Sequence, residues 1–325
     1  MKKALRYTLL TFTVIVVIVG VAAAYIKFGL PDTGDPENIT IHYTPERVQR
    51  GEYLANHVTL CVDCHSTRDW SLFSAPPTAG TLGKGGEAFT PQMGFPGSFY
   101  SANITPAAVS GYTDGELFRA ITTGVKKNGK AMFPVMPYLN YGKMDREDIY
   151  DIIAYIRTLQ PLDNKIPESE ADFPVNFLIN TMPTKAALVT KPPVSDTIAY
   201  GGYLVKAGAC GECHTPFDRG KFDEAFRLAG GRIFELPGGT LRSANITPAA
   251  SGIGKLSKSD FITLFKQYAD SNYRSPKIDF TKEYNTIMPW TMYAGMKEED
   301  LGAIYVYLRT LQPVDHEVVK FTGRK

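Results

Sequence analysis

Two short stretches of the chain hold the residues best suited to chemistry. One reads CVDCH and the other CGECH, so all four cysteines lie in two Cys-x-x-Cys-His motifs. At this spacing two thiols can form thioether bonds to the two vinyl groups of a porphyrin, and the adjacent imidazole can ligate its iron. The motifs therefore predict two covalently bound haem c groups. The residues are Cys61, Cys64 and His65 in the first motif and Cys210, Cys213 and His214 in the second.

Two other uses of four cysteines have to be weighed. In an exported protein they can form two disulfides. Two Cys-x-x-Cys pairs can also share one zinc ion. Neither use requires a histidine directly after each pair, whereas attachment of haem c does. Haem attachment is therefore the favoured prediction, and the disulfide and zinc alternatives stay open.

A methionine followed by proline recurs at a similar distance from each motif. Met136 follows His65 at nearly the same separation in the sequence as Met288 follows His214. A thioether is the usual second axial ligand where a cytochrome carries electrons, because neutral sulfur stabilises ferrous iron and raises the potential. We predict His65 and Met136 as the axial ligands of the first iron, and His214 and Met288 as those of the second.

Other residues compete for the axial positions. Met132 in the first copy and Met292 in the second lie close to the predicted ligands, and methionine often only fills a core. Met144 and Met296 occupy matching positions at the start of the last helix of each copy and are expected to pack. His57, four residues before the first motif, could ligate an iron with two histidines, but a packing role is favoured.

Most of the chain consists of two similar copies, and each copy contains one of the two motifs. The octamer SANITPAA occurs at Ser101–Ala108 and again at Ser243–Ala250. A longer block, Met136–Pro161, aligns without a gap on Met288–Pro313, with 13 of 26 positions identical. Apolar residues at helical spacing close each block and predict one buried helix face. Each copy therefore predicts a first helix, the motif, a loop rich in glycine and proline, a short helix, a Met-Pro loop and a final helix.

Smaller matches support the duplication. The stretches Thr113–Glu116 and Ser257–Asp260 both carry the signal of a helix start, a hydroxyl residue with a carboxylate three positions later. Aromatic contacts between first and last helices are expected for two pairs, Tyr53 with Tyr155 and Tyr203 with Tyr307.

The N-terminus predicts export and a membrane location. Lys2, Lys3 and Arg6 precede an uncharged run of 20 residues, Tyr7–Ile26, which as a helix would be about 30 Å long and match a bilayer. The positive flank should stay in the cytoplasm. We predict a single-pass anchor in the inner membrane with the rest of the chain on the periplasmic side. Ala22–Ala24 offers a cleavage site, so a removed signal sequence is the alternative.

Composition limits the remaining choices. The chain has 325 residues, 44% hydrophobic and 21% charged, with 35 Lys and Arg against 33 Asp and Glu. No basic tract with interleaved aromatic residues is present, which predicts no nucleic-acid partner. The predicted organisation is an anchor or signal at 1–28, a linker at 29–43, a first domain at 44–163, an interdomain linker at 164–193, a second domain at 194–317 and a tail at 318–325.

The motifs in this order resemble a known family, the membrane-attached multihaem c-type cytochromes that serve periplasmic alcohol, aldehyde and sugar-acid dehydrogenases. The second copy carries the likeness most fully, in CGECHTPF (Cys210–Phe217) and SANITPAASGIGKLSKSDF (Ser243–Phe261). The first copy keeps SANITP but has GYTDGELF (Gly111–Phe118) in place of the Gly-Ile-Gly element. Those subunits commonly carry three haem domains, whereas this chain has two motifs.

The resemblance implies a mainly α protein with two tandem class I cytochrome c domains behind the N-terminal helix. The expected function is single-electron transfer between a dehydrogenase or quinol-linked donor and a terminal oxidase or other acceptor, without catalytic residues. The alternative is a dihaem enzyme, either a peroxidase or a dehydrogenase of small sulfur compounds. Such an enzyme needs one iron with an open or displaceable ligand, and two matching Met-Pro loops argue against that.

Overall fold

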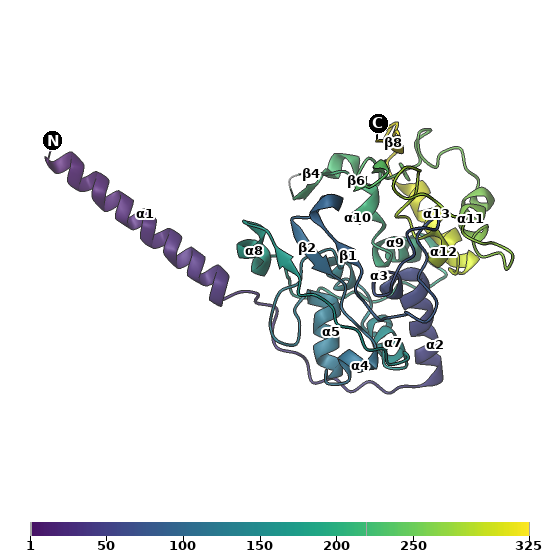
Figure 1. The fold of residues 1–325 in the computed structure, drawn as a ribbon, viewed down its shortest axis with the longest axis horizontal. Coiled ribbons are helices and arrows are strands. Elements are labelled where there is room, and N and C mark those ends of the chain that lie inside the picture. Colours follow the sequence, from purple (N-terminus) through teal and green to yellow (C-terminus); the bar gives the residue numbers. More distant parts are fainter. Residues whose placement is uncertain (1, 219, 325) are drawn as a thin grey trace.

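The uncharged run near the N-terminus forms one long helix, α1 (Lys2–Phe28), in the computed structural model, which describes residues 2–218 and 220–324 (Figure 1). Of the helices in these two ranges it is the one long and apolar enough to cross a membrane, and none of its apolar window is buried against the rest of the chain. An anchor and a signal sequence share these properties.

Two equivalent sets of elements follow α1. We call residues 44–163 the first half and residues 194–317 the second half. The first half contains α2 (Pro45–Tyr53), the π-helical turn η1 (Leu54–Val58), α3 (Cys61–Cys64), β1 (Ala88–Phe89), η2 (Pro91–Met93), β2 (Gly97–Tyr100), α4 (Pro106–Val109), α5 (Asp114–Thr123), α6 (Tyr138–Tyr141) and α7 (Arg146–Ile156). The connection between the halves contains β3 (Glu170–Ala171), α8 (Val175–Leu178) and η3 (Ile179–Thr181).

The second half follows a similar order, with one added hairpin and, in its described residues, no helix equivalent to α4. It contains α9 (Thr197–Ala207), α10 (Cys210–His214), β4 (Phe217–Asp218), β5 (Lys221–Phe222), η4 (Glu224–Phe226), β6 (Ile233–Leu236), β7 (Gly239–Arg242), α11 (Lys258–Lys266), α12 (Trp290–Tyr293) and α13 (Glu298–Thr310), and the tail adds β8 (Phe321–Gly323). The described chain is therefore mainly helical, with three small antiparallel sheets.

The first and last helices of each half cross at a glycine. Helix α2 packs on α7, and α9 packs on α13. A Cβ atom on Gly51 would collide with the backbone oxygen of Asp151, and one on Gly201 with the backbone oxygen of Ala303. Glycine allows two helix backbones to approach this closely because it has no side chain. The two halves thus use the same crossing.

One inserted residue distinguishes the two first helices. Tyr53 lies eight residues before Cys61, whereas Tyr203 lies seven residues before Cys210. The first half accommodates the extra residue in η1, where the Thr59 N–H donates to the Leu54 carbonyl five residues earlier at 2.8 Å. A π-helical turn holds one more residue than an α-helical turn, so the motif still follows the helix at the same place.

Each half is completed by a strand from the segment that follows its last helix. The linker strand β3 pairs with β2, with Gly97 opposite Ala171, and the tail strand β8 pairs with β7, with Leu241 opposite Phe321. The sheets β1-β2-β3 and β6-β7-β8 are therefore equivalent. Both strands close their half over the loops that follow the Cys-x-x-Cys-His motif.

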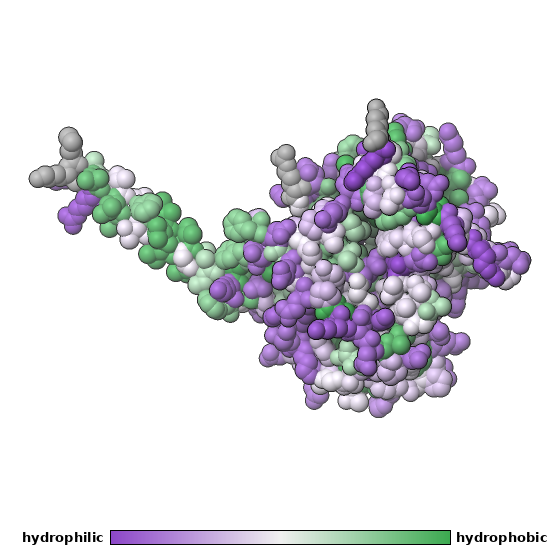
Figure 2. Space-filling view, in the orientation of Figure 1, coloured by the Kyte–Doolittle hydropathy of each residue, from purple (hydrophilic) through white to green (hydrophobic). Residues whose placement is uncertain are grey.

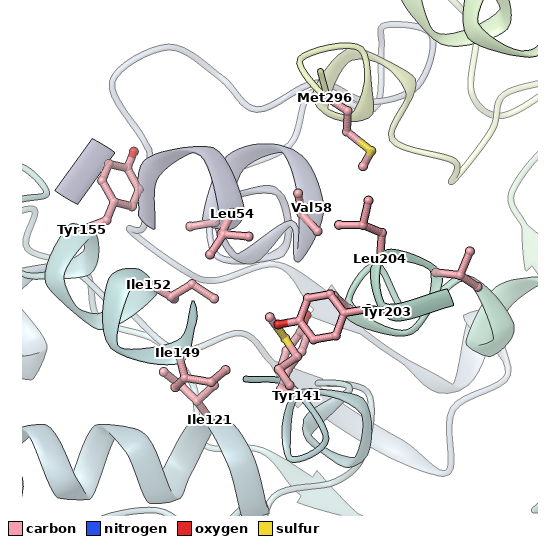
Figure 3. Close-up of a cluster of buried hydrophobic side chains, with 14 of the residues drawn as sticks. Leu54, Val58, Ile121, Tyr141, Ile149, Ile152, Tyr155, Tyr203, Leu204 and Met296 are labelled. Carbon is pink, nitrogen blue, oxygen red and sulfur yellow. The ribbon is translucent and has the colours of Figure 1, made fainter. Parts of the chain in front are cut away.

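The two halves share a single hydrophobic core (Figure 3). Buried side chains of the first half, among them Leu54 and Ile149, join those of the second, among them Leu204 and Met296, in one continuous cluster. Burial of apolar area is the main favourable term in folding, and here the buried cluster extends across both halves. The two halves are therefore packed against each other.

Two tyrosines cross the boundary between the halves in opposite directions. The Tyr53 hydroxyl donates to Asp300 Oδ2 at 2.5 Å, and the Tyr203 hydroxyl donates to Asp148 Oδ2 at 2.7 Å. These hydroxyl bonds hold the two rings in place. The sequence predicted aromatic contacts of Tyr53 with Tyr155 and of Tyr203 with Tyr307. Each hydroxyl instead reaches the first turn of the last helix in the other half, which gives the boundary an approximate two-fold symmetry.

Candidate haem-binding sites

The structure orients both motif histidines in the same way. His65 Nδ1 lies 2.6 Å from the Ala102 carbonyl oxygen, and His214 Nδ1 lies 2.7 Å from the Ala244 carbonyl oxygen. A carbonyl only accepts, so Nδ1 must carry the proton and donate. The lone pair is then on Nε2, which is the atom able to bind a metal. A carbonyl that fixes the tautomer and the ring angle in this way is typical of ligating histidines.

Burial sets the protonation of the motif residues. Desolvation lowers the pKa of both His65 and His214, against the opposing effect of their bonds to the backbone carbonyls, which favours the neutral imidazole that a metal requires. Burial raises the pKa of Cys64 and of Cys210 to about 12. Redox-active dithiols need a lowered thiol pKa, and Cys64 and Cys210 do not have one.

The repeated octamer holds the motif histidine against the end of each half. Next to the carbonyl that binds the histidine, Asn103 Nδ2 donates to the Leu162 carbonyl at 2.6 Å, and Asn245 Nδ2 donates to the Val314 carbonyl at 2.9 Å. The amide oxygen of each asparagine accepts the hydroxyl of the threonine two residues on, at 2.7 and 2.8 Å. The octamer thus links the motif to the chain that leaves the last helix. The sequence shows the repetition but not these roles.

A glycine closes the loop after each motif. The Gly85 N–H donates to the His65 carbonyl at 2.7 Å, and the Gly230 N–H donates to the His214 carbonyl at 2.8 Å. Both glycines have positive φ, and a Cβ atom on either would collide with the backbone of the octamer. Only glycine fits such a position without strain. The matching stretches GGEAF and GGRIF contain these two residues.

The two Met-Pro loops have the same backbone arrangement. The Tyr138 N–H donates to the Met136 carbonyl at 2.8 Å, and the Trp290 N–H donates to the Met288 carbonyl at 2.9 Å. Each methionine is partly exposed and stands just before a short helix, α6 or α12. Their role as iron ligands stays a prediction.

The neighbouring methionines behave differently from these two. Met144 is fully buried and Met296 is 2% exposed, and both lie in the hydrophobic core, which confirms the packing role expected for them. Met132 donates its backbone N–H to the Gly124 carbonyl at 2.8 Å, so its backbone is joined to the end of α5.

A loop of the first half braces the Met-Pro loop of the second. The Ser74 hydroxyl donates to the Met288 carbonyl at 2.7 Å and accepts the Trp290 N–H at 2.9 Å. The Ser74 N–H donates to Asn285 Oδ1 at 2.9 Å, and both of these side chains are completely buried. No sequence signal pointed to this contact, because it joins residues that lie far apart in the chain and belong to different halves.

Two matching tyrosines lie between the motifs. The Tyr141 hydroxyl donates to the Thr59 carbonyl at 2.7 Å, and the Tyr293 hydroxyl donates to the Gly208 carbonyl at 2.9 Å. Burial raises the pKa of Tyr293 well above its ordinary value, and Cys210 and Cys213 of its own half and Cys64 of the other half raise it further. Tyr293 therefore lies close to both motifs.

His57 has a structural partner in the other half. Its Nδ1–H donates to the Met292 carbonyl at 2.8 Å, and its ring packs against Gly295, where a Cβ atom would collide with it. This arrangement favours the packing role over a role as a ligand.

The arrangement of the motif residues can be compared with the zinc, disulfide and haem alternatives. In the two described ranges no group of three or more His, Cys, Asp or Glu side chains is arranged to hold a metal ion, and all four cysteines are free thiols. What each half does offer is two thiols on one helical turn, a neutral imidazole with a lone pair on Nε2, and a glycine-lined loop beside it. These residues fit a covalently attached haem.

Comparison with known proteins agrees with this chemistry. The family described as Cytochrome c matches residues 198–312. The chain is 30% identical to the "Alcohol dehydrogenase (quinone), cytochrome c subunit" of Gluconacetobacter polyoxogenes, across 82% of this chain and 56% of that protein. It is 31% identical to the "Fructose dehydrogenase cytochrome subunit" of Gluconobacter japonicus, across 81% of this chain and 52% of that protein.

A shorter relative matches over most of both chains. The "Diheme cytochrome c-type" of Cereibacter sphaeroides is 29% identical, across 75% of this chain and 81% of that protein. The chain spans about half the length of the two dehydrogenase subunits above. Residues 198–312 therefore match the cytochrome c family, haem proteins of electron transport, and the chain as a whole resembles the multihaem cytochrome c subunits of alcohol, fructose and gluconate dehydrogenases.

Proposed function

We propose that the chain is a dihaem electron carrier in which each half is a class I cytochrome c domain, at residues 44–163 and 194–317. The observation that carries the proposal is the equal orientation of the two motif histidines by Ala102 and Ala244. Haem c would be held by Cys61, Cys64, His65 and Met136 in the first domain, and by Cys210, Cys213, His214 and Met288 in the second.

Bound haem supplies one-electron chemistry at its iron, and the chain determines the type and orientation of the ligands. The carbonyls of Ala102 and Ala244 hold the two imidazoles in one tautomer and at one angle. If they ligate the iron, the thioethers of Met136 and Met288 would favour the reduced metal. Ligands fixed in this way change little between the two oxidation states, so an electron can be exchanged without a substrate pocket or a proton-transfer residue.

The shared core supports a relay between the two sites. Leu54, Ile149, Leu204 and Met296 belong to one cluster, so the sites are held at a fixed separation. Tyr141 and Tyr293 lie between the motifs, and Tyr141 belongs to this core while Tyr293 packs against it. An electron that enters at one domain can then leave at the other without any movement of the domains.

We further propose that α1 is retained as a single-pass anchor in the inner membrane, with both domains on the periplasmic side. The relatives named above are cytochrome subunits of alcohol and fructose dehydrogenases. By analogy the donor would be a dehydrogenase or a quinol-linked complex, and the acceptor a terminal oxidase or another redox protein. The anchor would restrict the search for these partners to the membrane surface.

Carbon monoxide tests the proposal against a dihaem enzyme. The purified protein should contain two haem c groups per chain, and its fully reduced absorption spectrum should not change when the gas is added, because tight methionine ligation leaves no open position. Met136→Ala and Met288→Ala should each make one haem reactive. A single haem per chain, or a wild-type haem that binds the gas, would contradict the proposal, and the second result would favour the enzyme.

A further inference from the structure

The linker between the halves carries apolar side chains that the fold leaves in solvent. In residues 172–181 the exposed fractions are 83% for Phe173, 39% for Phe177 and 38% for Leu178. Val175 and Ile179 in the same segment are also only partly covered. Asp172 is the one charged residue of the segment. Adjacent apolar side chains gathered on one short segment mark a surface that is covered in the working protein.

The segment lies at the end of the membrane helix. Helix α8 and the turn η3 contact α1, and Asn180 Nδ2 donates to the Ile26 carbonyl at 3.3 Å. Figure 1 shows α8 beside the end of α1 that meets the body, and in Figure 2 the apolar surface of α1 continues onto it. Ile26 is the last residue of the uncharged run, and Lys27 follows it.

The depth of the segment follows from that contact. An uncharged run of 20 residues spans about 30 Å as a helix, which is the thickness of the hydrocarbon core. Its last residue therefore lies at the boundary between the acyl chains and the headgroups. A segment bonded to Ile26 lies at the same depth. Phenylalanine and leucine side chains on a short helix are well suited to this layer.

We propose that residues 172–181 form a second membrane contact, with Phe173, Phe177 and Leu178 inserted among the lipid headgroups where α1 leaves the bilayer. The inference rests on the proposed retention of α1 as an anchor. The strand before the segment, β3, is paired with β2 in the first half. Two attachments, α1 and α8, then prevent the domains from swivelling freely and hold them at one orientation to the membrane.

Photolabelling from within the lipid tests the contact. The full-length, haem-loaded protein would be placed in vesicles of phosphatidylcholine and phosphatidylglycerol that contain a phospholipid with a diazirine in its acyl chain. After illumination, peptide mass spectrometry locates the adducts. Leu264 on α11 is the matched control, because its 38% exposure equals that of Leu178 and α11 lies on the opposite side of the body from α1.

We expect adducts in α1 and in residues 172–181, and none in α11. The double variant Phe177→Asp/Leu178→Asp should lose the adducts in the segment while α1 keeps its own, and Leu264→Asp should change neither. Adducts in α1 alone would overturn the contact but leave the anchor in place, and the segment would then face water or a partner protein. Removal of α1 from the mature chain, seen by N-terminal sequencing, would overturn both. Equal labelling of α11 would also overturn the proposal.

Discussion

At the scale of single residues, Asn103 and Asn245 each join several segments of the fold through hydrogen bonds. Each amide is buried, each donates to a carbonyl after the last helix, and each accepts a threonine hydroxyl. The neighbouring carbonyls orient the motif histidines. A buried polar group that loses its partner costs about 1–3 kcal/mol. The same side chain therefore links the stability of a half to the orientation of its metal ligand.

Replacement of Asn245 by alanine should lower the free energy of unfolding by about 1–3 kcal/mol, because the buried Thr247 N–H loses the amide oxygen it donates to and the Val314 carbonyl loses one of its donors. Urea denaturation followed by haem absorption measures this change. The control is Asn272→Ala, an exposed site where a change within about 0.5 kcal/mol is expected. Equal effects at the two sites would contradict the role given to the octamer.

His57 makes the folding stability of the protein depend on pH, and the burial of its side chain determines the direction of that dependence. Desolvation lowers the pKa of His57 below 6.5, and Lys266 lowers it further, against the opposing effects of the Met292 carbonyl and Glu52. As the pH falls below 6.5, the unfolded chain takes up a proton that the folded chain does not yet bind. The contribution of neutral His57 to folding stability is therefore complete above pH 6.5 and is lost as the pH falls below it.

The variant His57→Gln should remove this component. Between about pH 7.5 and 5.5 the unfolding free energy of the wild type should fall more steeply than that of the variant, since only the wild type loses the histidine's contribution. Denaturation curves at both pH values measure the difference. Parallel slopes for the two proteins would show that His57 titrates equally in the folded and unfolded states.

At the scale of elements, the repeat predicted most of what each half contains. Helices α5 and α11 begin at the predicted capping boxes. The final helices bury the face that the spacing indicated, with Ile149, Ile152 and Ile153 at most 1% exposed in α7 and Leu301 and Leu308 at most 1% exposed in α13. Local signals sufficed here, because helix caps and amphipathic spacing depend on residues close together in the chain.

Contacts between the halves could not be predicted in the same way. Tyr53 bonds to Asp300 in place of the expected aromatic contact, and Ser74 of the first half reaches Met288 of the second. Which residues meet across the boundary depends on how two folded surfaces pack, and no periodicity of the sequence encodes that. The predicted iron ligands occupy matching places in the two halves, but no motif indicated that the first half would brace the second site.

The helix crossings make a sharp test of packing. In Gly201→Ala the new Cβ atom would collide with the Ala303 backbone, so α13 has to move away from α9. A loss of about 1–3 kcal/mol in unfolding free energy is expected from such overpacking. Gly111→Ala is the control, since a Cβ atom there meets nothing within 4 Å. Thermal denaturation that finds the two variants equally stable would show that the crossing is not tight.

The brace on the second Met-Pro loop can be tested one site at a time. Ser74→Ala removes the bonds to Met288 and Trp290, so ligation by Met288 should loosen while the first site is unaffected. A redox titration should show one of the two potentials lowered and the other unchanged. Ser71→Ala is the control, because the Ser71 hydroxyl bonds to Asp69 at an exposed site. A shift of both potentials, or of neither, would contradict a local brace.

At the scale of the whole molecule, the boundary between the halves behaves like a symmetric interface. The Tyr53 hydroxyl donates to Asp300 and accepts the Lys297 N–H, while the Tyr203 hydroxyl donates to Asp148 and accepts the Asp145 N–H. Burial raises the pKa of both tyrosines, so both hydroxyls are protonated donors at neutral pH. Reciprocal bonds of this kind are typical of two-fold interfaces between identical chains, and here the two copies lie in one chain.

Because the halves share one core and exchange these bonds, we expect them to unfold together. Each single variant, Tyr53→Phe or Tyr203→Phe, should cost about 1.5–3 kcal/mol, since Asp300 and Asp148 are almost fully buried and lose a donor. Tyr43→Phe is the matched control, because the Tyr43 hydroxyl also bonds a carboxylate, Asp114, but at an exposed site. It should cost much less.

The double variant decides whether the boundary couples the two domains. In the wild type, denaturation followed by the absorption of each haem should give one transition. With both tyrosines replaced, two of the hydrogen bonds that join the halves are lost together, which weakens the boundary, and the two haem signals should separate. Two transitions already present in the wild type would mean that the halves fold independently. The fixed separation of the two sites, on which the proposed relay depends, would then lose its physical basis.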